Sequence, residues 1–445
     1  MNSHEKFRFK SLDEMKAKAQ ELDAEIKFSD NLTILATPVK FGRFTCPNRM
    51  VSHPMEGCDG LTDGTPGELT IRKYLRFAAG GWGLIWVEAC AVVPEGRANP
   101  RQLWITSKNL SVYKKLVDDM RMKAKESMGM DFNPIIILQL THSGRYSKPE
   151  GKPAPIIAHH SIIDASSHVT QDTPIITDEY LDTLPAKFAD AAKLAQAAGF
   201  DAVDIKACHR YLISELLASF TRENSRYGGS YENRTRLIKD ITQAIKDAVP
   251  NMEITSRLNL YDALEYPYGW GVSATEKMGM DFNEPQKLIG ELILMGMNGF
   301  NTTIGNPYYN PHFNRPFDAP VKGGYLPDEH PLLTTARIIK ATRLAQTAYP
   351  EQTFIGAGYS WLRQYTPQVA AGIVEAGWAK MVGLGRGCLA YPDFPIDMFN
   401  GSVDPKKVCI SCSGCTQIMR DGGMSGCIIR DAEIYGPIYR QGLNK

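Results

Sequence analysis

Three features are missing from this chain of 445 residues, and each absence narrows its function. No run of eighteen apolar residues occurs, so we expect no transmembrane helix and no membrane partner. The first twenty residues lack the apolar core of a signal peptide, which makes the cytoplasm the expected location. An excess of basic residues is also missing, because 50 Lys and Arg stand against 49 Asp and Glu. Nucleic acid is therefore not an expected partner.

The chain contains eight short apolar runs that alternate with stretches of helical periodicity. Hydrophobic residues make up 43% of the sequence, which is enough for a large core. Strands that alternate with helices predict a parallel sheet, and eight strands can close a (β/α)8 TIM barrel of the α/β class. The expected strands lie in residues 49–54, 83–93, 134–140, 202–207, 253–260, 299–304, 353–358 and 381–385. The clearest helical stretches are 183–198, 235–248, 285–295 and 334–348.

Segments with a different character precede and follow the barrel. Ser11 and Glu14 have the spacing of a capping box, and apolar residues recur at helical spacing from Leu12 to Ile26. This pattern predicts an amphipathic helix that packs on the barrel. We therefore divide the chain into an N-terminal helical extension (1–30), a TIM barrel (31–401) and a small C-terminal cysteine-rich segment (402–445).

Polar residues gather where the predicted strands end. His142 follows the third strand, residues 209–211 follow the fourth, Arg257 lies on the fifth and Arg386 follows the eighth. The C-terminal ends of barrel strands form the active face of such enzymes. One histidine alone is usually a structural residue, but several polar residues on one rim favour a site. Two long loops, 261–281 and 306–331, should lie over the same face.

Two glycine-rich turns follow the seventh and eighth strands. Phosphate groups often bind there, because bare backbone N–H groups and an arginine can reach them. The alternative is that Gly356–Gly358 and Gly383–Arg386 are simply tight turns. They are not dinucleotide fingerprints, since no separate βαβ unit with a downstream acid follows.

The nine cysteines are unevenly distributed. Five are scattered, whereas four near the end have the spacing C-x2-C-x2-C-x11-C. Clustered cysteines in a cytosolic chain bind metal more often than they form disulfides. One compact triplet with a lone fourth cysteine differs from the two separated C-x2-C knuckles of a zinc ribbon, although four thiolates can also bind zinc. The clustered residues are Cys409, Cys412, Cys415 and Cys427.

Five long motifs, in order, resemble the Old Yellow Enzyme family of FMN-dependent ene-reductases. The similarity is greatest to its iron–sulfur branch, which includes 2,4-dienoyl-CoA reductase and trimethylamine dehydrogenase. The matching stretches run from about Pro38 to Pro395, and the cysteine run follows them. They read PVKFGRFTCPNRMVSHPMEG, GGWGLIWVEACAVVPEGR, QLTHSGR, AVDIKACHRYLISELLASFTRENSRYGGSYENR and VGLGRGCLAYPDFP.

The resemblance implies an FMN site in the barrel. It places Arg257 near N1 and C2=O of the flavin, where a fixed cation favours the reduced anion. Glu56 falls near the N5 edge, either protonated and donating to the flavin or pointing away. Pro54, Met55 and Ala89 would contact the flavin, Gln139 would bind its pyrimidine edge, and Gly356, Gly358, Gly385 and Arg386 would hold its phosphate.

The resemblance also implies a reaction, in which hydride passes from reduced FMN to an activated C=C bond. Tyr211 matches the proton donor, and His209 and Lys206 suit the donors to a carbonyl or carboxyl oxygen. His142 and Arg145 either shape this site or serve as scaffold. The substrate is a small unsaturated molecule; an enoate, an enone, a steroid or a CoA thioester all fit.

Two residues beside His209 depart from the family pattern. Lys206 stands where a His is frequent, and Arg210 stands where Gly is usual. Both add positive charge beside the expected substrate pocket. They either bind an anionic part of the substrate, with Lys206 the better candidate, or pair with a protein carboxylate. Glu56 and Glu88 are the candidate carboxylates.

In the iron–sulfur branch a similar cysteine run binds a [4Fe–4S] cluster, so the resemblance implies one here. Relatives continue into domains that bind FAD and NAD(P)H, whereas this sequence ends at Lys445. We therefore expect an external electron donor, either NAD(P)H, a ferredoxin or a flavoprotein. Electrons would pass one at a time through the cluster, or as hydride from NAD(P)H directly. A homo-oligomer is compatible with the sequence.

Two other functions remain open on the sequence alone. One is an oxidative flavoenzyme, such as an amine dehydrogenase or demethylase, on the same scaffold. Lys206 and Arg210 would repel a cationic amine, which counts against it. The other is a non-catalytic electron-transfer subunit with zinc in place of the cluster. The presence of both Tyr211 and His209 counts against that function.

Overall fold

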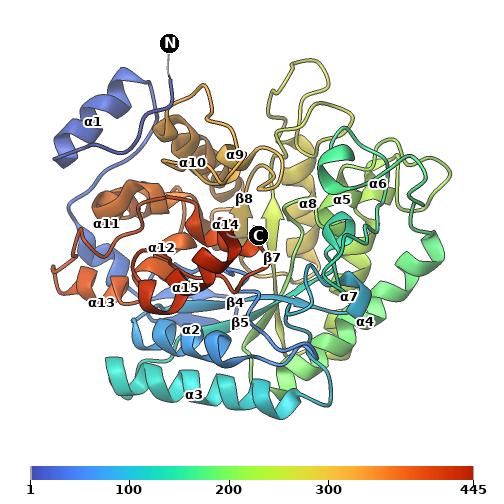
Figure 1. The fold of residues 1–445 in the computed structure, drawn as a ribbon, viewed down its shortest axis with the longest axis horizontal. Helices are drawn as coiled ribbons and strands as arrows, with labels where there is room; N and C mark the ends of the chain where they lie inside the picture. The colour runs from blue at the N-terminus through green and yellow to red at the C-terminus, as the bar shows by residue number, and fades with distance from the viewer. Residues whose placement is uncertain (1–2, 444–445) are drawn as a thin grey trace.

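The centre of the molecule is a closed barrel of eight parallel strands, as the sequence predicts. The computed structural model describes residues 3–443. The strands follow one another in the order β10-β3-β4-β5-β6-β7-β8-β9, and Figure 1 shows the helices arranged around them. All eight predicted strands are present: β3 (Met50–Ser52), β4 (Leu84–Ala91), β5 (Ile135–Thr141), β6 (Ala202–Ile205), β7 (Glu253–Asn259), β8 (Phe300–Thr303), β9 (Phe354–Gly356) and β10 (Met381–Leu384).

The helices alternate with the strands, as the predicted βα pattern requires. α4 begins five residues before the predicted start because Thr177 caps it, accepting a bond from the Tyr180 amide at 3.3 Å. Within residues 3–443, no helix is long and apolar enough to cross a membrane. The helices are α1 (Leu12–Glu21), α2 (Glu68–Ala79), α3 (Leu110–Met128), α4 (Asp178–Ala197), α5 (Leu212–Leu217), α6 (Tyr231–Arg234), α7 (Arg236–Ala248), α8 (Asn283–Leu294), α9 (Pro311–Asn314), α10 (Pro331–Ala348), α11 (Thr366–Glu375), α12 (Arg386–Ala390), α13 (Phe394–Phe399), α14 (Gly414–Arg420) and α15 (Ala432–Leu443).

A β-hairpin that the sequence analysis missed closes one end of the barrel. Its strands, β1 (Val39–Phe41) and β2 (Phe44–Cys46), are antiparallel and only three residues long. Phe41 is fully buried and packs against residues at the amino ends of the barrel strands, such as Ile135 and Ala202. The hairpin therefore seals the end opposite the expected active face.

The N-terminal extension contains the predicted helix, but the helix is shorter than expected. Ser11 Oγ accepts a bond from the Glu14 amide at 3.2 Å, as the capping box predicts. α1 ends at Glu21, because Asp23 adopts a left-handed conformation with φ of 51°. The chain then crosses α11 at Gly372, where an added Cβ would lie 2.5 Å from the Phe28 amide nitrogen. Glycine is required at this close approach.

The cysteine-rich segment, which contains α14 and α15, is attached to the barrel at several points. Asp431 pairs with Arg72 and Arg76 of α2, at 2.6 Å each. The Ser425 amide donates to the carbonyl of Gly57 at 2.6 Å, and the Lys322 amide donates to the side chain of Gln417 at 2.7 Å. These contacts hold the segment between the loop after β3 and the loop after β8, over the carboxyl end of the barrel (Figure 1).

Candidate functional site

A cavity opens at the carboxyl end of the barrel and is lined by both the barrel loops and the cysteine-rich segment. Its empty space, including the open mouth, is about 1070 Å³. Of the predicted site residues, it brings together Pro54, Met55, Glu56, Lys206, His209, Tyr211, Arg257, Gly358, Gly385 and Arg386. Residues as far apart in sequence as the loop after β3 and the loop after β10 thus form one site.

Glu56, Lys206 and Tyr211 form a hydrogen-bonded group in this cavity. Lys206 Nζ lies 2.8 Å from Glu56 Oε1, so the lysine has a protein carboxylate as its partner. The Tyr211 hydroxyl donates to the same oxygen at 3.1 Å and lies 3.0 Å from the hydroxyl of Tyr308. Burial, with the Glu56 charge beside it, raises the pKa of Tyr211 well above its usual value. The phenol therefore stays protonated at neutral pH and can donate a proton.

The turn that carries His209 has an unusual backbone. His209 and Arg210 both have positive φ, at 64° and 59°. For residues with side chains this conformation costs about 1–2 kcal/mol each. Arg210 is fully buried, and its guanidinium bonds Asp262 Oδ2 at 3.1 Å and His159 Nε2 at 3.2 Å. Of the two alternatives for Arg210, the structure shows pairing with a protein carboxylate, but the partner is Asp262 rather than Glu56 or Glu88, and Arg210 does not line the cavity.

The other candidate carboxylate, Glu88, pairs with neither of the two cations beside His209. It accepts a bond from Lys73 at 2.5 Å and one from the Gly57 amide at 2.6 Å. Glu88 lies where the register of β4 and β5 shifts, a bulge that turns this side chain toward α2. Its contacts instead fix the loop that carries Glu56.

Three of the predicted flavin contacts do not line the cavity. Gln139 donates to Asp204 Oδ2 at 2.5 Å, because the two residues are register partners on β5 and β6. Ala89 is fully buried in β4. The carbonyl of Gly356 lies 3.2 Å from His53 Nε2. Their roles toward a ligand remain predictions.

The sequence analysis did not identify several cavity residues. Tyr308, Asn314 and Arg315 come from the long loop 306–331, whereas the other long loop, 261–281, does not line the cavity. Met419 and Arg420 come from α14. Burial lowers the pKa of Arg315 to about 9, with Arg386 as the next cause. The length of loop 306–331 was the only available signal, and length does not say which side chains turn inward.

The four clustered cysteines line a second, smaller cavity. Its empty space is about 360 Å³. Backbone amides point at two of the sulfurs, from Ser411 to Cys409 at 3.4 Å and from Arg430 to Cys427 at 3.3 Å. Across residues 3–443, no three His, Cys, Asp or Glu side chains converge closely enough to hold a single metal ion. The lining of this cavity includes all four cysteines together with Arg386 and Arg430.

The two cavities share a wall. Arg386 and Cys415 line both of them. Arg386 donates to the carbonyl of Pro316 at 2.6 Å, and a second nitrogen of its guanidinium is buried without a partner among the described residues. A ligand in the larger cavity would therefore lie next to whatever the cysteines hold.

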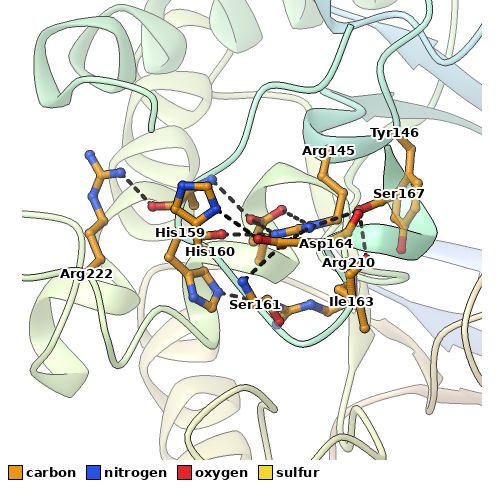
Figure 2. A network of polar contacts seen from close by, with 12 residues as sticks. Arg145, Tyr146, His159, His160, Ser161, Ile163, Asp164, Ser167, Arg210 and Arg222 are labelled. Carbon is orange, nitrogen blue, oxygen red and sulfur yellow. Dashed lines mark hydrogen bonds and ion pairs between the residues drawn. The ribbon is translucent and has the colours of Figure 1, made fainter. Parts of the chain in front are cut away.

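A buried polar network contacts the turn through Arg210 (Figure 2). Arg145 bonds Glu215 twice, at 2.8 and 3.1 Å, and Asp164 at 2.7 Å. Its nitrogen Nη2 also donates to the carbonyl of His159. Glu215 lies on α5, which begins directly after Tyr211, so the network holds the C-terminal side of the turn. His142 lies outside the cavity too, with Nε2 3.0 Å from the Tyr180 hydroxyl.

Replacing His159 by glutamine should reduce the loss of stability in acid. Burial, and next the Arg210 charge, lower the pKa of His159 to about 3. Between pH 6.5 and 3 the unfolded state binds a proton that the folded state excludes, so unfolding becomes easier as pH falls. One such group contributes up to about 1.4 kcal/mol per pH unit in this range.

The measurement is the free energy of unfolding in urea at several pH values from 7 to 4.5. His159→Gln should flatten the pH dependence, since glutamine can still accept from Arg210. The exposed His168 provides the matched control, and His168→Gln should leave the slope unchanged. An unchanged slope for His159→Gln would contradict the prediction.

Comparisons with known proteins agree with the family resemblance in the motifs. The NADH:flavin oxidoreductase / NADH oxidase family matches residues 34–290. A metal reductase of Desulforamulus reducens is 27% identical over 393 residues, which cover 86% of this chain and 51% of the relative. A cinnamate reductase of Clostridium sporogenes is 26% identical over 423 residues, which cover 91% of this chain and 58% of the relative. The chain thus spans about half the length of these relatives.

A similarity to solved structures concerns the fold. A 2-naphthoyl-CoA reductase in complex with 2-naphthoyl-CoA superposes with a TM-score of 0.71 at 20% identity. The match covers 92% of this chain and 58% of that one. At this identity the match shows the fold alone, and the matched part is a little over half of the longer chain.

Proposed function

The chain belongs to the NADH:flavin oxidoreductase / NADH oxidase family, and on this premise we propose that it is an ene-reductase. It would use FMN and a [4Fe–4S] cluster, take electrons from an external donor and reduce an alkene activated by a carbonyl or carboxyl group. The observation that carries the proposal is the convergence of Tyr211, His209 and Lys206 in one cavity with bare glycine backbone and arginines. The names of two relatives, a cinnamate reductase and a metal reductase, agree with reductive chemistry.

The cavity fits FMN in its size, charge and donors. Arg257 and Arg386 each have a buried guanidinium nitrogen without a partner among the described residues, which suits an anionic ligand. Gly385 presents bare backbone to the cavity beside Met55, whose sulfur would lie 2.9 Å from an added Cβ. We propose that Arg257 binds the pyrimidine end and that Gly358, Gly385 and Arg386 bind the phosphate. When bound, FMN supplies the hydride chemistry.

The cysteine cavity fits a cluster. Four thiolates are the usual ligands of [4Fe–4S], and hydrogen bonds to the sulfurs tune its potential. Cys409, Cys412, Cys415 and Cys427 would hold the cluster, and the amides of Ser411 and Arg430 would supply two such bonds. The proposed divisions of the chain are 1–30, 31–401 and 402–445, and the proposed donors are NAD(P)H, a ferredoxin or a flavoprotein.

The side chains of the cavity can perform the remaining steps on an alkene. Lys206 and His209 bind the carbonyl or carboxyl oxygen, where negative charge develops. Tyr211 gives its proton to the α-carbon, and its raised pKa keeps that proton available until then. Glu56 fixes both Lys206 and Tyr211 through one carboxylate oxygen.

The direct test of the proposal is the content of the purified protein. Anaerobically prepared protein should release FMN on denaturation and contain about four iron atoms with acid-labile sulfide. Cys412→Ser should remove the iron and its broad visible absorbance but leave FMN bound, because the proposed flavin contacts lie in the barrel. FAD or no flavin would contradict the flavin proposal. Zinc without iron would contradict the cluster proposal.

A further inference from the structure

The charges that line the larger cavity are far from balanced. Five cationic side chains line it, whereas Glu56 is the only lining carboxylate in the described part of the chain. Glu56 is already paired with Lys206 at 2.8 Å. Among residues 3–443, no carboxylate lies within 4 Å of any of the four lining arginines. Cations held away from water need anionic partners, so the cavity is built for anions. The four arginines that line the cavity are Arg257, Arg315, Arg386 and Arg420.

Two of these arginines remain after the proposed function is taken into account, and this inference rests on that function. FMN would use Arg257 and Arg386. Arg315 comes from loop 306–331, donates to the hydroxyl of Thr416 and has a buried Nε without a partner among the described residues. Arg420 is exposed at the rim, at the end of α14. Both line the part of the cavity that the cysteine-rich segment helps to form.

The position of Arg315 relates it to the substrate. The side-chain nitrogen Nδ2 of the preceding residue, Asn314, lies 3.2 Å from Nε2 of His209. His209 and Lys206 are the proposed donors to the oxygen on which negative charge develops. Arg315 therefore adds a cation on the side of the cavity where a substrate carboxyl group would lie, and its planar guanidinium can bind both oxygens of a carboxylate.

We propose that Arg315, assisted by Arg420 at the rim, binds a carboxylate of the substrate, so that the enzyme selects unsaturated acids over neutral unsaturated carbonyl compounds. The same cation stabilises the charge that builds on the carboxylate oxygens during reduction. Selection by charge would depend on loop 306–331 and on α14, that is, on a residue of the barrel and a residue of the cysteine-rich segment together.

The test compares cinnamate with methyl cinnamate, which differ in one negative charge. Each ligand is titrated into FMN-loaded protein, and the dissociation constant is read from the change in flavin absorbance. Arg315→Gln should weaken cinnamate binding by about ten- to a hundredfold, the effect of a lost charge-assisted contact. Binding of methyl cinnamate should change by less than about threefold. Arg315→Lys should recover part of the affinity for cinnamate, and Arg420→Gln should have a smaller effect because Arg420 is exposed.

The control is Arg440→Gln, which removes an exposed cation from α15 that does not line the cavity. It should leave both dissociation constants unchanged. Equal weakening of both ligands in Arg315→Gln, or loss of FMN or iron from it, would overturn the inference, because Arg315 would then serve a cofactor. The proposed function would stand in that case. Wild-type protein without FMN would overturn the proposed function and this inference with it.

Discussion

Replacement of Tyr211 by phenylalanine is expected to slow alkene reduction by about 10²- to 10⁴-fold, the usual contribution of a general acid. The change removes one oxygen from a ring that is buried and packed under Lys206, whose Nζ lies 3.7 Å from the ring centroid. The shape of the cavity is therefore retained. The α-carbon of the substrate loses its proton donor, and Glu56 and Tyr308 each lose a hydrogen-bond partner.

The measurement separates the two half-reactions in rapid-mixing experiments. Reduction of the enzyme by its donor should stay near normal, because the proposed proton transfer occurs only when the alkene is reduced. Tyr308→Phe is the matched control, since it removes the hydroxyl 3.0 Å from that of Tyr211 without removing the proposed acid. That variant should lose much less activity. Equal loss in both half-reactions of Tyr211→Phe would indicate a structural role for Tyr211.

Replacement of Arg145 by methionine should destabilise the protein by about 3–5 kcal/mol, the cost of removing one partner from a buried ion pair. Arg145 and Glu215 are both fully buried and joined by two bonds. Although burial acts to raise it, the Arg145 charge helps to hold the pKa of Glu215 below its usual value. Without Arg145, a buried carboxylate would remain beside the turn that carries His209 and Tyr211.

Urea denaturation at pH 7 gives the free energy of unfolding. Arg226 offers a matched control, because it also pairs with a carboxylate, Asp182, but its side chain is 59% exposed. Arg226→Met should cost much less stability than Arg145→Met, because solvent screens an exposed ion pair. Adding Glu215→Leu to Arg145→Met should restore part of the lost stability, since it removes the uncompensated charge. If both arginine substitutions lowered the free energy of unfolding equally, burial of the ion pair would not determine the loss of stability.

The barrel could be predicted from the amino-acid sequence because its strands are uniformly buried. All residues of β5 and β7 are buried, so these strands appear as uninterrupted runs between helical stretches. The polar residues after the strands could be recognised because one end of a barrel collects them. The capping box of α1 and the spacing of the four cysteines could also be recognised, because the residues that define each pattern are close in sequence.

Which charged side chains face the cavity depends on contacts between residues that are distant in sequence. Lys206 meets Glu56 across 150 residues of sequence, and Arg210 meets Asp262 across 52. Both cations are adjacent to the same turn, yet one lines the cavity and the other is buried outside it. The hairpin β1–β2 was missed because its two short strands lie outside the alternation of strands and helices from which the barrel was predicted. The inward position of Arg315 depends on how a long loop folds against α14, and such contacts between distant segments leave no local pattern in the sequence.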